Sequence, residues 1–177
     1  MQTERLTLRN LTADDAPRVA ELAGDWHVAR MTARLPYPYS RADATAWIAE
    51  LGQASDEVVF AIVHEGQLIG CFGYVVKDRR TAEIGYWIGR PFWGHGFATE
   101  AGRALVDHCF RCAGFTRLTC CHFVDNPASG RVIEKLGFRL VGPCSGYSEA
   151  RAEEAPTLTY ERRRSWSAYI ASQGMPA

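Results

Sequence analysis

The chain has 177 residues, of which 47% are hydrophobic, and its 20 basic and 20 acidic residues give a formal net charge of zero. This length can bury a full core, so we expect a single domain spanning residues 1–177. The balanced charge disfavours a nucleic-acid partner, and no apolar run is long enough for a membrane span. The N-terminus is polar and has no signal peptide, which predicts a cytoplasmic protein.

The first half of the chain predicts short helices alternating with strands. The expected elements are a strand at 5–9, a helix from the capping sequence at 12–15 to about 23, a short helix and loop at 25–39, and a helix from 40 to about 52. Strand patterns follow at 57–64 and 67–76, joined by a hairpin turn at Glu65-Gly66, and a fourth strand is expected at 81–89.

The second half continues with the same alternation. The expected elements are a helix at 97–113 ended by Gly114, a strand at 117–124, a helix at 127–136 ended by Gly137, and a final strand pair at 138–144 and 157–164 joined by a polar loop. These elements predict one α/β domain with a mixed sheet.

The six cysteines raise the alternatives of a metal site and a disulfide framework. Cys120 and Cys121 precede His122, and all three are residue types that bind zinc. The two cysteines lie on an expected strand, however, and would point to opposite faces. A core-facing helical stripe is expected at Ala98, Ala101, Leu105, Cys109 and Cys112. We therefore expect no metal site and no disulfide framework.

A glycine pair separates the fourth strand from the helix that follows it. Gly94-His-Gly96 should form a tight turn that leaves the backbone N–H groups of residues 94–99 without helical partners. Such a turn at a positive helix end can bind a phosphate or pyrophosphate, although a plain turn is the simpler interpretation. Thr99 stands where a dinucleotide fold needs its third glycine, and no P-loop string occurs.

A second motif indicates which ligand carries the phosphate that the turn could bind. It is Asn-Pro-Ala-Ser-Gly-Arg-Val-Ile-Glu-Lys-Leu-Gly-Phe at 126–138. Together with Tyr86-Trp-Ile-Gly and Trp93-Gly-His-Gly-Phe-Ala-Thr-Glu-Ala101, it resembles the GNAT superfamily of acyl-CoA N-acyltransferases, and in particular its RimJ/RimL-like branch. The opening segment 3–9 and the segments around 14–15 and 36–48 are also similar, so the resemblance extends from residue 3 to about 164.

The resemblance implies a GNAT-like α/β fold with a mixed, mostly antiparallel sheet, flanking helices, and fourth and fifth strands that splay apart. Acetyl-CoA is then the acyl donor, and its arm lies in the gap between these strands. The family's anion signature falls on Trp93, Gly96 and Ala98, and Trp93 replaces the usual Gln or Arg, which leaves the contact to backbone N–H groups. The expected donor-binding residues are Trp87, Ile88, Gly94, His95, Gly96, Phe97, Ala98, Thr99 and Asn126.

N-acetylation requires a base for the amine, donors for the carbonyl oxygen and a donor for the leaving thiolate. Glu83 is the candidate base, with an exposed strand-end carboxylate as its alternative interpretation. The tyrosine that many relatives use as an acid is replaced by Ile133, so Ser129 is the candidate donor, unless it is only a first-turn serine. Asn126, before Pro127, is expected to be the N-cap of a helix. The resemblance implies that its side chain also contacts acetyl-CoA.

Other polar and aromatic residues near these motifs have two interpretations each. Tyr86 lies near the splay but is typical of a core residue, and His95 suits a solvated turn better than a catalyst. Arg131 and Lys135 could reach the phosphates or could be ordinary surface charges. Acceptor contacts are expected from residues 26–39 and from the polar loop 145–156.

The predicted function is transfer of an acetyl group from acetyl-CoA to a primary amine, either a protein N-terminus or a small amine, by direct attack in a ternary complex. One alternative is a non-catalytic acyl-CoA-binding sensor, which the missing tyrosine at Ile133 favours. Another is a nucleotide-binding module built on the Gly94-His95-Gly96 turn. The partners expected are the donor and an amine acceptor, without nucleic acid or membrane; a homodimer is compatible with this prediction but not required by it.

Overall fold

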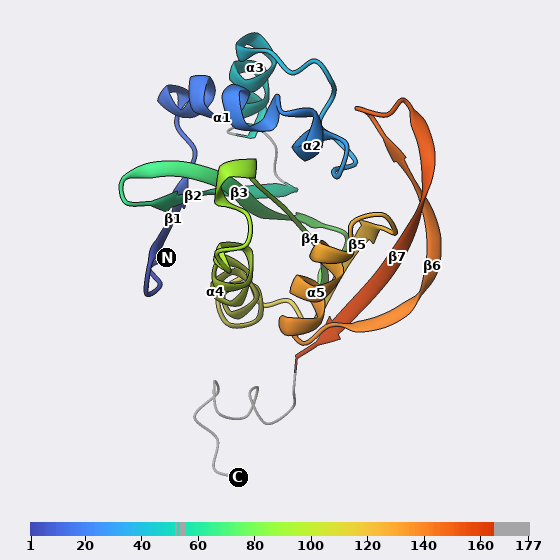
Figure 1. Ribbon diagram of the computed structural model, residues 1–177. Helices are drawn as coiled ribbons and strands as arrows, with labels where there is room; N and C mark the ends of the chain where they lie inside the picture. The colour runs from blue at the N-terminus through green and yellow to red at the C-terminus, as the bar shows by residue number, and fades with distance from the viewer. Residues whose placement is uncertain (52, 54–55, 165–177) are drawn as a thin grey trace.

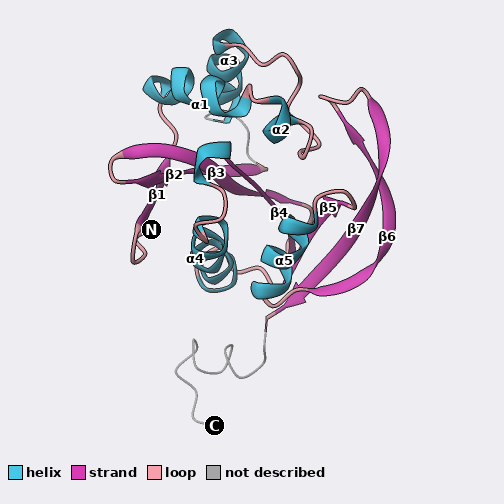
Figure 2. Ribbon diagram, viewed as in Figure 1, coloured by secondary structure: helices cyan, strands magenta, loops and turns pink. Residues whose placement is uncertain are grey.

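The structure is a computed structural model that describes residues 1–51, 53 and 56–164. Within these residues, seven strands form one sheet in the order β1-β2-β3-β4-β5-β7-β6 (Figures 1 and 2). The strands are β1 (Leu6–Asn10), β2 (Glu57–His64), β3 (Gln67–Val76), β4 (Thr81–Ile88), β5 (Arg117–Phe123), β6 (Arg139–Ser148) and β7 (Glu153–Arg163). All neighbours are antiparallel except β4 and β5, which are parallel.

Helices cover both faces of this sheet. They are the 3-10 turn η1 (Ala13–Asp15), α1 (Ala16–Ala23), α2 (Trp26–Ala29), α3 (Arg41–Leu51), the 3-10 turn η2 (Arg90–Phe92), α4 (Phe97–Arg111) and α5 (Pro127–Lys135). Figure 1 shows α1, α2 and α3 on one side of the sheet and α4 and α5 on the other.

Each face of the sheet has its own hydrophobic core. On the α4–α5 face, strand residues such as Phe72 and Leu118 pack against helix residues such as Leu105 and Ile133, all of them buried. On the other face, side chains of α1 and α2 pack against Ala61, Cys71 and Trp87 of the central strands. The run from Leu68 to Tyr74 is therefore buried on both faces, which explains its nearly continuous apolar sequence.

The predicted elements up to residue 137 are confirmed within one or two residues. Thr12 and Asp15 form the expected capping box, and Gly114 and Gly137 adopt positive φ after their helices. The expected end of α3 at Gly52 lies outside the described residues. Cys120 is buried and Cys121 is exposed, as a strand requires.

Two expectations are wrong. The region 145–156 is mostly strand and not a polar loop, because β6 and β7 form a long hairpin with a turn at 149–152. Most residues of β6 are exposed, so no alternation of buried and polar side chains marks that strand in the sequence. Cys112 is exposed because it caps the C-terminus of α4 and does not continue the stripe of buried residues that includes Ala101, Leu105 and Cys109.

Candidate active site

The parallel strands β4 and β5 separate after only a short stretch of pairing. Their register starts at Thr81 with Arg117 and stops at Glu83 with Thr119, although β4 continues to Ile88 and β5 continues to Phe123. The expected splay between the fourth and fifth strands is therefore present. It leaves one edge of β4 without a strand neighbour in the middle of the sheet.

The hydrogen-bond alternation of β4 determines which of its peptides face this gap. Gly89 donates to the Ile69 carbonyl at 2.8 Å, so residues at odd positions of β4 bond to β3, and the peptides of Tyr86 and Ile88 point the other way. The peptide of Trp87 therefore faces β3, and Trp87 itself lines the cavity. The Ile88 carbonyl accepts a hydrogen bond from the Trp93 indole N–H at 2.6 Å.

The glycine turn leads from β4 into α4. Gly94 and Gly96 have φ of 82° and 81°, a left-handed conformation that glycine adopts without steric cost. Within the described residues, none of the backbone N–H groups from Gly94 to Thr99 donates a hydrogen bond, and the first helical bond runs from Glu100 to the Gly96 carbonyl at 3.1 Å. These unpaired N–H groups at the positive end of a 15-residue helix have the geometry that suits an anion.

The segment around the first strand holds the turn in place, although the two segments are separated by about half of the chain. Arg5 donates from Nη1 to the His95 carbonyl at 3.1 Å and from Nε to the Glu100 carboxylate at 2.8 Å. Its guanidinium lies 4.7 Å from the centre of the Phe97 ring, on which His95 also stacks. Thr3 adds a 2.6 Å hydrogen bond to Glu100. The sequence of segment 3–9 does not indicate this contact, because Arg5 and Glu100 are 95 residues apart.

A second helix N-terminus borders the gap from the β5 side. Asn126 caps α5, because its side chain accepts a hydrogen bond from the Ser129 N–H at 3.2 Å, which confirms the expected cap. The Ser129 hydroxyl lies 3.0 Å from the Tyr86 hydroxyl. Tyr86 is therefore more than a core residue, and burial raises its pKa to about 12. Ile133, at the position of the missing tyrosine, is buried in the core.

The Glu83 side chain lies on the face of β4 that points away from Ser129, which belongs to α5. It shares a strand face with Trp87, which packs in the α1–α2 core, whereas Tyr86 packs on the α4–α5 side. Its carboxylate forms a 2.9 Å ion pair with Lys77, and both side chains are half-exposed. The candidate base and the candidate thiolate donor thus approach the gap from two sides of the sheet.

One cavity of about 1320 Å³ joins these features through the gap. From the α4–α5 side it is lined by Tyr86, Ile88, Gly94, Gly96, Phe97, Ala98, Thr99, Asn126, Ser129, Arg131, Ile133 and Lys135. From the other side it is lined by Tyr39, Trp47, Glu57, Gly73, Glu83, Gly85, Trp87 and Cys121. Of the predicted donor-site residues only His95 does not line the cavity, and its exposed ring stacks on Phe97.

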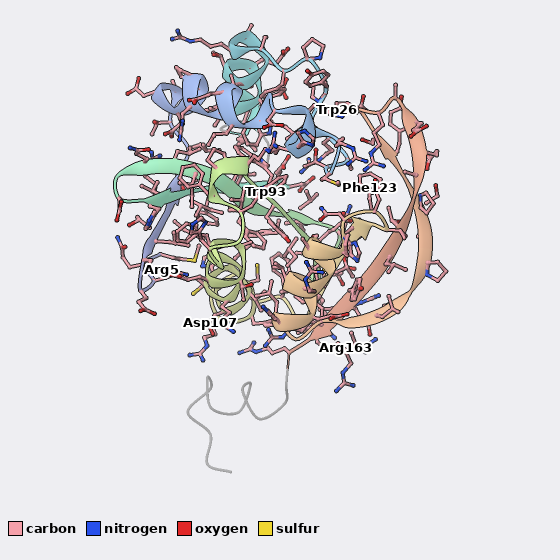
Figure 3. The ribbon with its side chains drawn as sticks, viewed as in Figure 1. Arg5, Trp26, Trp93, Asp107, Phe123 and Arg163 are labelled. Carbon is pink, nitrogen blue, oxygen red and sulfur yellow. The ribbon has the colours of Figure 1, made fainter. Side chains whose placement is uncertain are left out.

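The tip of the β6–β7 hairpin closes over the second side. Asp125 bonds to Arg30 at 2.7 Å and to Arg151 at 3.0 Å, and the hydrogen bond from Arg151 holds the pKa of Asp125 below its ordinary value. Arg151 also stacks over Phe123, which is labelled in Figure 3. Glu149 donates its N–H to the Ala33 carbonyl. The hairpin and the segment after α2 therefore make one wall, although the sequence suggested two independent loops.

Two further findings concern the predicted absences. Within the described residues, no group of three or more His, Cys, Asp or Glu side chains is placed to hold a metal ion. No described helix is both long enough and apolar enough to cross a membrane.

A strand gap with free peptides, beside a glycine turn that opens a helix, is the architecture of an acyl-CoA-dependent acyltransferase. The chain belongs to the acetyltransferase (GNAT) domain family, whose family model matches residues 5–139. It is an N-acetyltransferase that uses acetyl-CoA as its acyl donor, and its relatives include ribosomal-protein acetyltransferases of the RimJ/RimL type.

Three similar proteins illustrate this relationship. The uncharacterized N-acetyltransferase p20 of Bacillus licheniformis is 31% identical over 157 residues, covering 85% of this chain and 88% of its own. The ribosomal-protein-serine acetyltransferase of Escherichia coli is 36% identical over 86 residues, 48% of each chain. The solved structure of RimL, the ribosomal L7/L12 alpha-N-protein acetyltransferase in complex with coenzyme A, has a TM-score of 0.80 at 21% identity, covering 91% of this chain and 95% of its own.

Proposed function

We propose that this enzyme transfers the acetyl group of acetyl-CoA to a primary amine by direct attack within a ternary complex. The observation that carries the proposal is the single cavity through the β4–β5 gap. It opens to a phosphate seat on one side of the sheet and to a carboxylate on the other. Donor and acceptor can then meet in the gap without an intermediate carried by the protein.

The donor side follows from the free backbone groups. The N–H groups of residues 94–99 would bind the pyrophosphate, and the peptides of Tyr86 and Ile88 would pair with the amides of the pantetheine arm as an added strand does. Pairing at the Ile88 carbonyl requires the Trp93 indole to leave it or to share it, since that carbonyl already accepts a hydrogen bond. Asn126 and the first turn of α5 would border the thioester end.

The reaction then needs a proton acceptor for the amine on one side and a hydrogen-bond donor for the leaving sulfur on the other. Glu83, directly or through a water molecule, takes the proton of the attacking amine as the C–N bond forms. The C–S bond breaks, and the sulfur of coenzyme A leaves as a thiolate that accepts a hydrogen bond from Ser129 at the positive end of α5. Residues of the α2–α3 segment and the hairpin tip would contact the acceptor.

For the acceptor we favour the α-amine of a protein N-terminus. The relatives named for a ribosomal-protein substrate support this choice. A small amine is the alternative acceptor. The decisive experiment is a screen of peptides with varied first residues and of small amines, with acetyl-CoA as donor and a 42 Da mass shift as the readout. Failure of every amine to gain the acetyl group would contradict the proposal.

The base is tested by Glu83→Gln, which keeps size and hydrogen-bonding shape but cannot take the proton. We expect kcat to fall by about 100- to 10,000-fold near neutral pH, with coenzyme A binding unchanged. A higher pH should partly restore kcat, because more of the acceptor is then already neutral. An unchanged kcat across the pH range would show that Glu83 is only a strand-end charge.

A further inference from the structure

The hydroxyl groups of Tyr86 and Ser129 form a pair that the sequence motifs do not predict. Tyr86 comes from β4 and Ser129 from the first turn of α5, so the pair bridges the two sides of the gap. Their oxygen atoms are 3.0 Å apart, and both residues line the cavity. Within the described residues, neither hydroxyl has a second hydrogen-bond partner.

The surroundings hold the tyrosine side of this pair in place. The Tyr86 ring stacks on Phe72 with ring centres 4.8 Å apart and planes inclined by 28°. Phe72 is fully buried in the α4–α5 core, so the ring has little freedom to turn. Ser129 is fixed by the helix, where its own N–H bonds to the Asn126 side chain. The distance between the hydroxyl groups is therefore set by two rigid elements.

The chemistry of the two groups determines the direction of the hydrogen bond. Either hydroxyl could donate in this pair, and because a phenol is a stronger acid than an alkyl alcohol, the direction from tyrosine to serine is favoured. Burial keeps the phenol protonated by raising the pKa of Tyr86 to about 12. The serine proton is then not used within the pair and can point into the cavity.

We propose that Tyr86 is a positioning residue that orients the Ser129 hydroxyl as a hydrogen-bond donor to the sulfur of coenzyme A. The proposal rests on the proposed function, because it places the sulfur beside α5. Through this pair the chain supplies an oriented hydroxyl although Ile133 occupies the position of the family's tyrosine. No proton has to leave Tyr86, since the bond to Ser129 acts through orientation alone.

The test compares binding of coenzyme A and of desulfo-coenzyme A, in which hydrogen replaces the thiol group, by calorimetry at pH 9. Raising the pH increases the ionised share of the thiol, and hydrogen bonds to charged groups are stronger than neutral ones. We expect the wild type to prefer coenzyme A by about 10- to 100-fold. The preference should fall to about 1 in Ser129→Ala, and it should fall several-fold in Tyr86→Phe.

The double variant separates orientation from an independent effect. If Tyr86 acts only through Ser129, adding Tyr86→Phe to Ser129→Ala changes the preference no further. Tyr160→Phe is the matched control: it removes the hydroxyl of a buried tyrosine that does not line the cavity, although its partner His122, 3.4 Å away, does, and it should leave the preference intact. An unchanged preference in Tyr86→Phe, or an equal effect of that change with and without Ser129, would overturn the inference. If the wild type bound neither ligand, the proposed function itself would fail.

Discussion

The contact between the N-terminal segment and the phosphate turn should be measurable as a charge-dependent contribution to stability. Glu100 lies in the first turn of α4, and its carboxylate accepts from Thr3 Oγ1 at 2.6 Å, from the Arg5 N–H at 2.8 Å and from Arg5 Nε at 2.8 Å. Glu100→Gln keeps one accepting oxygen and the shape of the side chain. It removes the charge that faces the guanidinium and the helix N-terminus.

The expected magnitude follows from the exposure of the two partners. A hydrogen bond to a charged group contributes about 1.5–3 kcal/mol when well shielded. The Glu100 side chain is 16% exposed but that of Arg5 is 42% exposed, so solvent screening reduces the contribution. We expect Glu100→Gln to lower the free energy of unfolding by about 1–2 kcal/mol, or the melting temperature by about 2–8 °C.

The sign of the pH dependence provides a stricter check. Burial raises the pKa of Glu100, but the hydrogen bonds from Thr3 and Arg5 outweigh it and hold the pKa below the ordinary 4.5. A carboxylate with a depressed pKa stabilises the fold above its unfolded pKa and loses this contribution as the pH falls through its folded pKa. The difference between wild type and variant should therefore be full near pH 7 and should shrink below pH 4.5.

Denaturant unfolding at pH 7 and at a series of acidic pH values measures both effects. Glu21→Gln is the matched control, because its 2.7 Å pair with Arg18 involves a carboxylate side chain that is 63% exposed and should contribute less than about 0.5 kcal/mol. The affinity for coenzyme A should also fall in Glu100→Gln, since the turn loses part of its support. A stability difference that stayed constant with pH would refute the charge-based argument.

Three further outcomes follow from the structure. Lys77→Met should change stability by less than about 1 kcal/mol and kcat by less than about 5-fold, because its ion pair with Glu83 is half-exposed. Denaturant unfolding checks the first value, and kcat with the acceptor identified by the amine screen checks the second. Asp125→Asn removes the carboxylate that joins Arg30 and Arg151, so it should raise the KM for the acceptor while calorimetry finds coenzyme A affinity unchanged. A pKa of about 12 for Tyr86 means that a pH–rate profile should show no loss of kcat from its ionisation up to pH 10.

The local parts of the fold could be predicted from the sequence because they depend on neighbouring residues. A glycine pair after a strand predicts a left-handed turn, and both Gly94 and Gly96 have positive φ. Asn before Pro127 predicts a helix cap, which Asn126 forms. The final strand pair was predicted, but its extension through residues 145–156 was missed because most residues of β6 are exposed and that strand lacks a buried face.

The parts that could not be predicted depend on contacts between distant segments. Arg5 and Glu100 are separated by most of the first hundred residues, and no spacing rule brings them together. The pair of Tyr86 and Ser129 depends on where α5 docks against the gap. The direction of the Trp87 peptide depends on the hydrogen-bond phase between β3 and β4, which a single sequence does not reveal.

Two matched glycines test whether the turn at the N-terminus of α4 binds the phosphates of acetyl-CoA. Gly96 and Gly114 lie at opposite ends of α4 with φ of 81° and 80°, so Gly96→Glu and Gly114→Glu carry similar backbone strain. Coenzyme A titrations by calorimetry should give wild-type affinity for Gly114→Glu and at least about a 100-fold loss for Gly96→Glu, because its carboxylate repels the pyrophosphate. Wild-type affinity in a folded Gly96→Glu variant would contradict the account.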